Sequence, residues 1–392
     1  MFMNAYSFDT KLLHNKYKFD PATGGVSVPI QHASTFHQQS VSEFGKYDYS
    51  RSLNPTREAL EEIIADLEGG CRGFAFSSGM AAISTAFLLL SHGDHIVITE
   101  DVYGGTFRMV TQVLNRFGIE HTFVDMTDLK AVEKAVQHNT ALFYVETPSN
   151  PLLKVTDIEA VSSLAKKYGA YTFVDNTFMT PYLQKPLELG ADLVLHSATK
   201  FLSGHSDTVA GLAVARDPEL AERLYSLQNS FGAVLGVQDA WLVMRGIKTL
   251  SVRMKQAQDS AGRIARFLKD APLIKEVFYP GLEDHPQFAL QSKQAAGPGA
   301  VLSFELQNAE LLDAFIEKVH LPVFAVSLGA VESILSYPAK MSHAAMPDQE
   351  RRSLGISDGL LRLSVGLEHA DDLIADFKQA LEQMTTQKEG IL

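Results

Sequence analysis

The chain has 392 residues, of which 46% are hydrophobic and 20% charged, and its formal net charge is −12. This length allows a large buried core and two or three domains, and the composition is typical of a globular enzyme. The negative charge disfavours nucleic acids and anionic membranes as partners, and the single cysteine, Cys71, excludes an internal disulfide and a cysteine-based metal cluster.

The N-terminal segment lacks the basic region and apolar core of a signal peptide, and the longest apolar stretch, residues 81–90, is too short to span a bilayer. We therefore expect a cytoplasmic protein. Residues 1–60 show little periodicity and contain several turn formers, which predicts an extended N-terminal arm. Tyr49 and Arg51 near its end are suited to a subunit interface, although the residues alone favour a solvated arginine at Arg51.

Helical and strand patterns alternate beyond the arm, over residues 61–250, which we expect to form a large domain. A helix is predicted from Thr56 to Gly69-Gly70, because apolar residues recur at helical spacing. Short β-branched and aromatic runs predict strands at residues 74–77, 95–99, 121–125, 142–146, 171–175, 193–196 and 211–215. Amphipathic spacing predicts helices at residues 80–90, 105–117, 129–137 and 158–168. This alternation predicts an α/β fold with a mostly parallel, doubly wound sheet.

A smaller C-terminal α/β domain is predicted over residues 251–392, joined to the large domain by a long helical region at residues 239–267. Its expected elements are strands at residues 277–279, 300–305, 324–328 and 361–365, and helices at residues 310–319 and 370–384. A cleft between the two domains is the expected active site.

The segment Gly73–Ala82 passes from a strand through small residues into a helix. Backbone N–H groups at such a helix start, here those of Gly79 and Met80, bind phosphate, and the helix dipole favours its negative charge. Ser197 and Thr199 could add hydroxyl donors. Tight turns between a strand and a helix use small residues in any case, so this turn alone is weak evidence.

Two predicted strands end in groups of complementary chemistry, Asp175 and Lys200. The carboxyl ends of strands in an open α/β sheet border one crevice, so both side chains are expected to face it. Apolar neighbours favour a neutral lysine, which can form a Schiff base with an aldehyde, and a carboxylate keeps a pyridinium nitrogen protonated. Alone, Lys200 would be an exposed loop lysine and Asp175 a turn cap. Together with the phosphate turn they indicate pyridoxal 5'-phosphate on Lys200.

Several motifs resemble the Cys/Met-metabolism family of pyridoxal phosphate enzymes, within the fold-type I, aminotransferase-like group. The matching segments extend over most of the chain: Tyr49-Ser50-Arg51, Ser77-Ser78-Gly79-Met80, Val102-Tyr103-Gly104-Gly105-Thr106, Glu146-Thr147-Pro148-Ser149-Asn150-Pro151, Val174-Asp175-Asn176-Thr177, His196-Ser197-Ala198-Thr199-Lys200 and Arg362-Leu363-Ser364-Val365-Gly366. The resemblance implies a large cofactor-binding domain with a mostly parallel sheet and a smaller C-terminal domain.

The resemblance also implies roles for residues whose local patterns leave other readings open. Tyr103 would stack on the cofactor ring and exchange protons with the substrate amine, although a hydrophobic staple at a helix start is the alternative. Asn150 would donate to the ring oxygen, although a turn would also select asparagine. Tyr49 and Arg51 would reach the phosphate of a neighbouring subunit, which makes a dimer the minimum, and the resemblance implies a homotetramer, a dimer of dimers.

The expected substrate site centres on Arg362, because arginine can hold an α-carboxylate with two parallel hydrogen bonds. From the residues alone, an ion pair of Arg362 with Glu368 or Asp358 is equally compatible. Ser327 is a secondary candidate for substrate binding. Glu332 could bind the distal ammonium group of the substrate, or be a structural acid.

The thirteen histidines show no spacing typical of a zinc site, and no nucleotide-binding glycine motif is present, so we expect neither a metal nor a dinucleotide. The resemblance implies a lyase of sulfur amino acids that cleaves L-cystathionine by β-elimination to homocysteine, pyruvate and ammonia in methionine biosynthesis, with Lys200 as the base. The related γ-lyases and γ-synthases share these residues and stay open as alternatives. A non-catalytic pyridoxal-binding protein is a more remote one.

Overall fold

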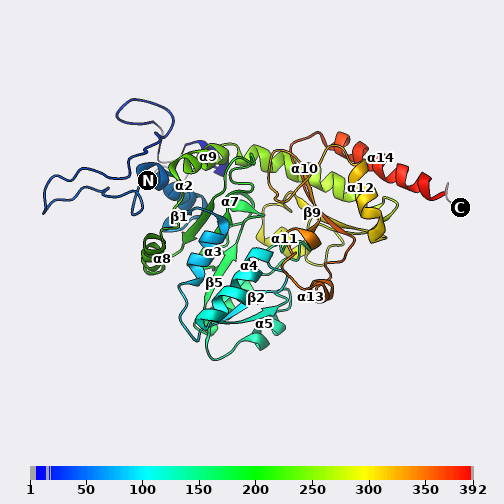
Figure 1. Cartoon of the computed structure of the whole chain (residues 1–392), viewed down its shortest axis with the longest axis horizontal. Helices are drawn as coiled ribbons and strands as arrows, with labels where there is room; N and C mark the ends of the chain where they lie inside the picture. The colour runs from blue at the N-terminus through cyan, green and yellow to red at the C-terminus, as the bar shows by residue number, and fades with distance from the viewer. Residues whose placement is uncertain (1–5, 15–16, 18, 390–392) are drawn as a thin grey trace.

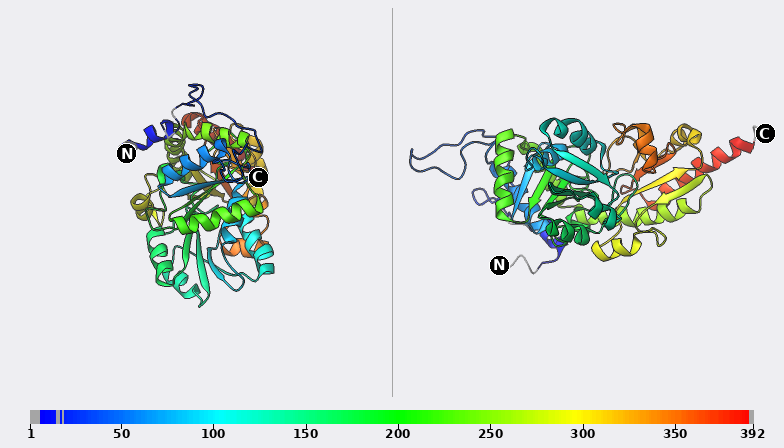
Figure 2. Two further views of the ribbon diagram at one scale, coloured as in Figure 1. Left: turned by 90° about the vertical axis from the view of Figure 1, so that its left-hand side faces the viewer. Right: turned by 90° about the horizontal axis from the view of Figure 1, so that it is seen from below.

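The computed structural model of the chain describes residues 6–14, 17 and 19–389, with side chains to residue 385. Figures 1 and 2 show two α/β parts that lie next to each other, with the N-terminal segment at one end and the C-terminal helix at the other. None of the helices in the described ranges is long and apolar enough to cross a membrane.

The first part is built around a seven-stranded sheet with the order β1-β7-β6-β5-β4-β2-β3. Strand β7 runs antiparallel to both of its neighbours, and the remaining pairs are parallel. This confirms the α/β class and the mostly parallel sheet. The strands are β1 (Arg72–Phe76), β2 (His95–Thr99), β3 (Glu120–Val124), β4 (Thr140–Glu146), β5 (Tyr171–Asp175), β6 (Leu193–Ser197) and β7 (Gly211–Ala215).

Helices cover both faces of this sheet (Figure 1). Alternate strand residues enter two different apolar clusters: Val174 and Val194 belong to one, and Phe173 and Leu195 to the other. This alternation with both faces buried is the packing of a doubly wound sheet. The helices are α2 (Pro55–Glu68), α3 (Gly79–Phe87), α4 (Gly104–Arg108), α5 (Leu129–Ala135), α6 (Ile158–Lys167), α7 (Thr180–Leu183), α8 (Pro218–Phe231) and α9 (Val237–Ile247).

The second part has a five-stranded sheet with the order β10-β11-β12-β9-β8 and its own apolar cluster, which includes Phe304, Phe315 and Phe377. Its strands are β8 (Ile274–Phe278), β9 (Val301–Leu306), β10 (Val323–Phe324), β11 (Ile334–Ser336) and β12 (Leu360–Ser364). Its helices are α10 (Leu250–Lys269), α11 (Phe288–Gln294), α12 (Leu312–Lys318), α13 (Asp348–Ser353) and α14 (Ala370–Glu389). Separate cores are consistent with a boundary near residue 250, and the boundaries at residues 60 and 250 stay predictions.

Several elements differ from the expected ones. A short helix, α1 (Phe8–Leu13), lies within the predicted arm, because Leu12 is fully buried in the large apolar cluster. Tyr17 and Val28 pack against the same cluster, whereas part of the segment 19–54 extends away from the body (Figures 1 and 2). The helical region expected at residues 239–267 consists of two helices, α9 and α10, and the strand expected at residues 324–328 ends at Phe324. Helix α8 and strand β11 were not expected.

Candidate functional site

A cavity of about 530 Å³ lies between the two parts, where the carboxyl ends of β4, β5 and β6 face loops of the smaller sheet. Ten of the predicted site residues line it: Gly79, Met80, Tyr103, Asn150, Asp175, Ser197, Thr199, Lys200, Ser327 and Arg362. A larger groove of about 1030 Å³ beside β8 contains none of them. Most of the charged side chains that line this groove form surface salt bridges, such as Lys275 with Glu305 and Arg352 with Asp358.

One end of the cavity is formed by the phosphate turn, residues 77–79, which joins β1 to α3. Ser78 is the N-cap of α3, and its side chain accepts a hydrogen bond from the Ala81 N–H at 3.0 Å. Helix geometry leaves the next N–H groups, at Gly79 and Met80, without intrahelical acceptors. Ser197 closes in from β6: a Cβ atom on Gly79 would lie 2.9 Å from the Ser197 Cβ. The absence of a side chain at Gly79 therefore lets Ser197 lie close to the N–H groups of Gly79 and Met80.

Lys200 lies in the turn that follows β6, and its Nζ donates a hydrogen bond of 2.6 Å to Ser327 Oγ. Burial, and to a smaller extent the positive charge of Arg362, lower the pKa of Lys200 to about 8. Ser327 holds this contact with a backbone φ of 93°, a strained conformation for a residue with a side chain. The amine is thus fixed in place and loses its proton more easily than an ordinary lysine.

Asp175 is the last residue of β5, in the position expected from sequence. Its Oδ1 accepts the Thr177 N–H at 3.0 Å, and its Oδ2 accepts the Tyr144 hydroxyl at 3.4 Å. Burial raises the pKa of Asp175, although the hydrogen bonds from Thr177 oppose that shift. A cationic group bound beside it would stabilise the ionised form.

Glu146 is a second buried acid in the cavity, and it is not among the site residues predicted from sequence. It ends β4 directly beside Asp175 in the sheet register, so the same strand-end argument could have found it. Its Oε2 accepts the N–H of Tyr103 at 3.1 Å. Burial raises the pKa of Glu146 well above its ordinary value, and the charge of Asp175 adds to the shift. Glu146 therefore fixes the backbone at Tyr103, in surroundings that favour its protonated form.

Arg362, on β12, is buried with 3% of its surface exposed. Its two terminal nitrogens donate to Asn150 Oδ1 and to the Ser327 carbonyl, both at 2.8 Å, and its Nε has no hydrogen-bond partner. No carboxylate of the described residues forms a salt bridge with it. Of the two acids considered as partners, Asp358 pairs with other arginines and Glu368 accepts from Ser333. Burial lowers the pKa of Arg362 to about 10, so a bound anion would be strongly favoured.

Three predicted site residues lie outside the cavity. Tyr49 is 46% exposed, and the guanidinium of Arg51 lies over its ring at 5.6 Å. Arg51 donates to the carbonyl and the side-chain oxygen of Asn229, at 2.6 and 2.7 Å. Glu332 is exposed and does not line the cavity. The roles expected for these three residues stay predictions.

Other lining residues come from loops whose sequences carry no periodic signal: Phe178, Val209, Met341 and Ser342. The loop at Ser342 lies tightly against the start of α4, since a Cβ atom on Gly104 would be 2.1 Å from the Ser342 carbonyl. This contact joins the smaller part to the Tyr103 segment. Among the residues that the structure describes, no group of three histidine, cysteine, aspartate or glutamate side chains could hold a metal ion.

The chain is similar to known proteins over almost its whole length. The family of Cys/Met metabolism PLP-dependent enzymes matches residues 9–382. The cystathionine beta-lyase MetC of Bacillus subtilis is 67% identical over 97% of each chain, and the cystathionine gamma-lyase of the same organism is 52% identical over 96% of this chain and 99% of that protein. The solved structure of cystathionine gamma-lyase from Lactobacillus plantarum, complexed with L-serine, has a TM-score of 0.94 at 47% identity and covers 97% of this chain and 100% of that chain.

Proposed function

The chain belongs to the Cys/Met metabolism PLP-dependent enzyme family, and from this premise we propose that it is a lyase that cleaves L-cystathionine at the Cβ–S bond. With one water, the products are homocysteine, pyruvate and ammonia, a step of methionine biosynthesis. One observation carries the proposal: a single cavity is lined by Lys200 with a pKa of about 8, the buried Asp175, and the buried Arg362, whose Nε has no hydrogen-bond partner. The match with the L. plantarum structure confirms the fold-type I architecture.

The cavity residues fit pyridoxal phosphate. The N–H groups of Gly79 and Met80, with the hydroxyls of Ser197 and Thr199, would hold the phosphate, and Asp175 would face the ring nitrogen. The raised pKa of Asp175 fits that role, because the pyridinium supplies the cation that keeps the carboxylate ionised. The aldehyde would bond to Lys200. When bound, the cofactor supplies an electron-accepting ring that stabilises negative charge at the substrate α-carbon.

The residues of the chain would then perform three tasks. Arg362 binds the substrate α-carboxylate, with Ser327 beside it, and Asn150 orients the guanidinium. Lys200 would accept the substrate α-proton on its neutral Nζ, and the homocysteine thiolate would leave from Cβ. Tyr103 covers the ring face and exchanges protons with the substrate amine.

The assembly is part of the proposal. Tyr49 and Arg51, exposed on the arm, would complete the phosphate site of a neighbouring subunit in a cytoplasmic homotetramer. Glu332 would meet the distal ammonium of cystathionine in this assembly. Sedimentation is expected to show at least a dimer that retains the cofactor, and an active, cofactor-saturated monomer would contradict this part of the proposal.

A γ-lyase or γ-synthase is the second candidate, favoured by the 52% identity with the B. subtilis γ-lyase. Incubation of the purified protein with cystathionine separates the two. Pyruvate with homocysteine is expected for cleavage at Cβ. If 2-oxobutyrate and cysteine appear instead, the bond has been assigned wrongly.

A further inference from the structure

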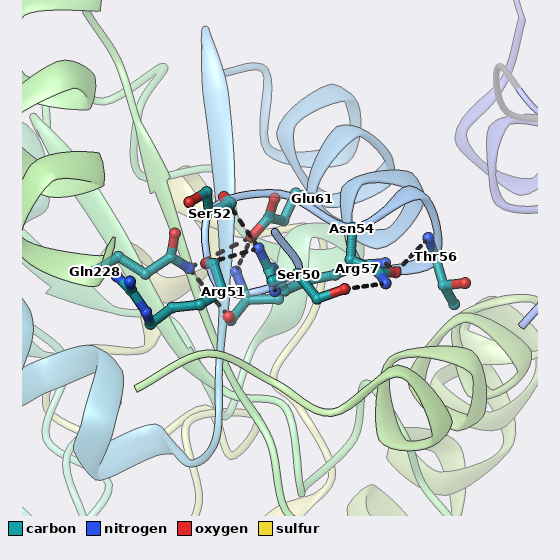
Figure 3. A network of polar contacts seen from close by, with 9 residues as sticks. Ser50, Arg51, Ser52, Asn54, Thr56, Arg57, Glu61 and Gln228 are labelled. Atoms are coloured by element: carbon teal, nitrogen blue, oxygen red, sulfur yellow. Dashed lines mark hydrogen bonds and ion pairs between the residues drawn. The ribbon is translucent and has the colours of Figure 1, made fainter. Parts of the chain in front are cut away.

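A buried arginine lies beneath the arm turn, which comprises residues 49–52. Arg57, on α2, is 2% exposed, and its terminal nitrogens donate to the carbonyls of Ser50 at 2.6 Å and of Arg51 and Ser52 at 3.2 Å each (Figure 3). Three carbonyls of one turn thus converge on one planar cation. Because arginine presents several donors in a fixed plane, this contact specifies the conformation of the turn as well as its position.

Glu61 connects the same arginine to the strand that leads into the phosphate turn. Its Oε1 lies 3.5 Å from Arg57 Nε and accepts the backbone N–H of Ala75, in β1, at 2.9 Å (Figure 3). Gln228 donates to both Glu61 and the Ala75 carbonyl. Burial raises the pKa of Glu61, and the charge of Arg57 opposes this shift. Only two residues separate Ala75 from Ser78, the cap of α3.

A second set of contacts joins the arm turn to the phosphate turn. Arg51 donates to Asn229 on α8, and the segment after α8 pairs with the end of β1, where the Ser77 N–H donates to the Ala233 carbonyl at 3.0 Å. A Cβ atom on Gly232 would lie 3.3 Å from Arg51 Cδ. The two turns are therefore connected through Arg57 and Glu61 on one side and through the end of α8 on the other.

We infer that Arg57 and Glu61 are positioning residues for cofactor retention, which hold the arm turn in fixed register with the phosphate turn of the same chain. The inference rests on the proposed role of Tyr49 and Arg51 at a neighbouring phosphate. Neither Arg57 nor Glu61 lines the cavity, so neither touches cofactor or substrate. The arm turn, which reaches the neighbouring subunit, and the phosphate turn of the same chain then move as one unit. Loosening the arm turn therefore weakens the binding of pyridoxal phosphate.

The test is a titration of cofactor-stripped protein with pyridoxal phosphate, followed by the absorbance of the bound cofactor. Arg57→Lys keeps the charge but offers one nitrogen to three carbonyls. We expect the dissociation constant to rise at least about tenfold, which corresponds to the loss of one hydrogen bond to a charged donor. Turnover at saturating cofactor should stay within about twofold of the wild type, because no reacting group has changed. Glu61→Gln keeps an oxygen for the Ala75 N–H and should have a smaller effect of the same kind.

Arg351→Lys is the matched control. Arg351 is equally buried and also binds a backbone carbonyl, at Ile356, and an acid, but it lies in the smaller part. We expect its lysine variant to lose thermal stability and keep the wild-type dissociation constant for the cofactor. An Arg57→Lys variant that behaved in the same way, with a lower melting temperature and unchanged cofactor affinity, would show a merely structural role and overturn the inference.

A double-mutant cycle with Arg51→Ala provides the second criterion. If Arg57 acts through the arm turn, Arg57→Lys adds less than about twofold to the dissociation constant when Arg51 is already alanine. Fully additive effects would overturn the inference, and Glu61→Gln can enter the same cycle if Arg57→Lys does not fold. These measurements follow cofactor binding, so they stay valid if the enzyme proves to cleave the other carbon–sulfur bond.

Discussion

Replacing Arg362 by lysine tests whether this buried guanidinium recognises the substrate carboxylate. Arginine reaches Asn150 Oδ1 and the Ser327 carbonyl with two separate nitrogens, each at 2.8 Å. Lysine keeps the charge but has a single nitrogen, so it cannot satisfy both acceptors and also hold a carboxylate with two hydrogen bonds. Losing two hydrogen bonds to a charged donor costs about 3–4 kcal/mol at the lower end of their range.

That cost corresponds to a decrease in kcat/KM of roughly 100- to 1000-fold. The assay is the initial rate of pyruvate formation over a range of cystathionine concentrations, and most of the loss should appear as a higher KM. Arg352→Lys, an exposed arginine paired with Asp358, is the control and should behave as the wild type. A kcat/KM for Arg362→Lys that stays within about threefold of the control would refute the carboxylate role.

Three further changes test the site. Lys200→Ala should abolish elimination and leave the circular dichroism spectrum unchanged, and measurable turnover would remove Lys200 from the role of base. The pKa of Lys200 is lowered to about 8, and only the neutral amine attacks an aldehyde. The rate at which cofactor-stripped protein binds pyridoxal phosphate should therefore rise with pH through about 8 and level off above it. A rate that still rises steeply near pH 10 would indicate an ordinary lysine. Glu146→Gln should keep at least about a third of the wild-type kcat, because a neutral amide oxygen can still accept the Tyr103 N–H, and Glu146→Ala should lose much more. Equal losses of kcat in the two variants would show that an ionisable group is required.

The residues that could be predicted from sequence are those whose backbone position decides where the side chain points. Asp175 and Lys200 follow buried strands, and the carboxyl ends of these strands share one edge, so their meeting in the cavity follows from topology. Glu146 obeys the same rule, because it is the last residue of the strand predicted at residues 142–146, so the rule could have identified it as well. The strand rule therefore identifies the centre of the site.

Loops and long-range contacts could not be predicted in this way. Ser342 reaches the cavity because its loop lies against Gly104, a contact between segments that no local pattern connects. The partners of Arg362 also lie elsewhere in the chain. A structural ion pair and a binding site for the substrate carboxylate therefore could not be distinguished from the sequence alone. Leu12 adds a helix to the arm because the core it joins is formed by residues far along the chain.

The reversed strand β7 sets the spacing of the site. It lies between β1 and β6 and runs opposite to both, so these two strands are parallel and end level with each other, with Phe76 and Ser197 both opposite Gly211. The ends of β1 and β6 are thereby two strand spacings apart, about 9.5 Å, a distance measured across hydrogen-bonded backbone. A Cβ atom on Gly211 would lie 2.0 Å from the Ser78 carbonyl, so the phosphate turn crosses directly over this residue to meet Ser197. Gly211 must therefore lack a side chain. A methyl group there would push the phosphate turn away from the sheet and lengthen the distance between the phosphate turn and Lys200 that the cofactor has to bridge.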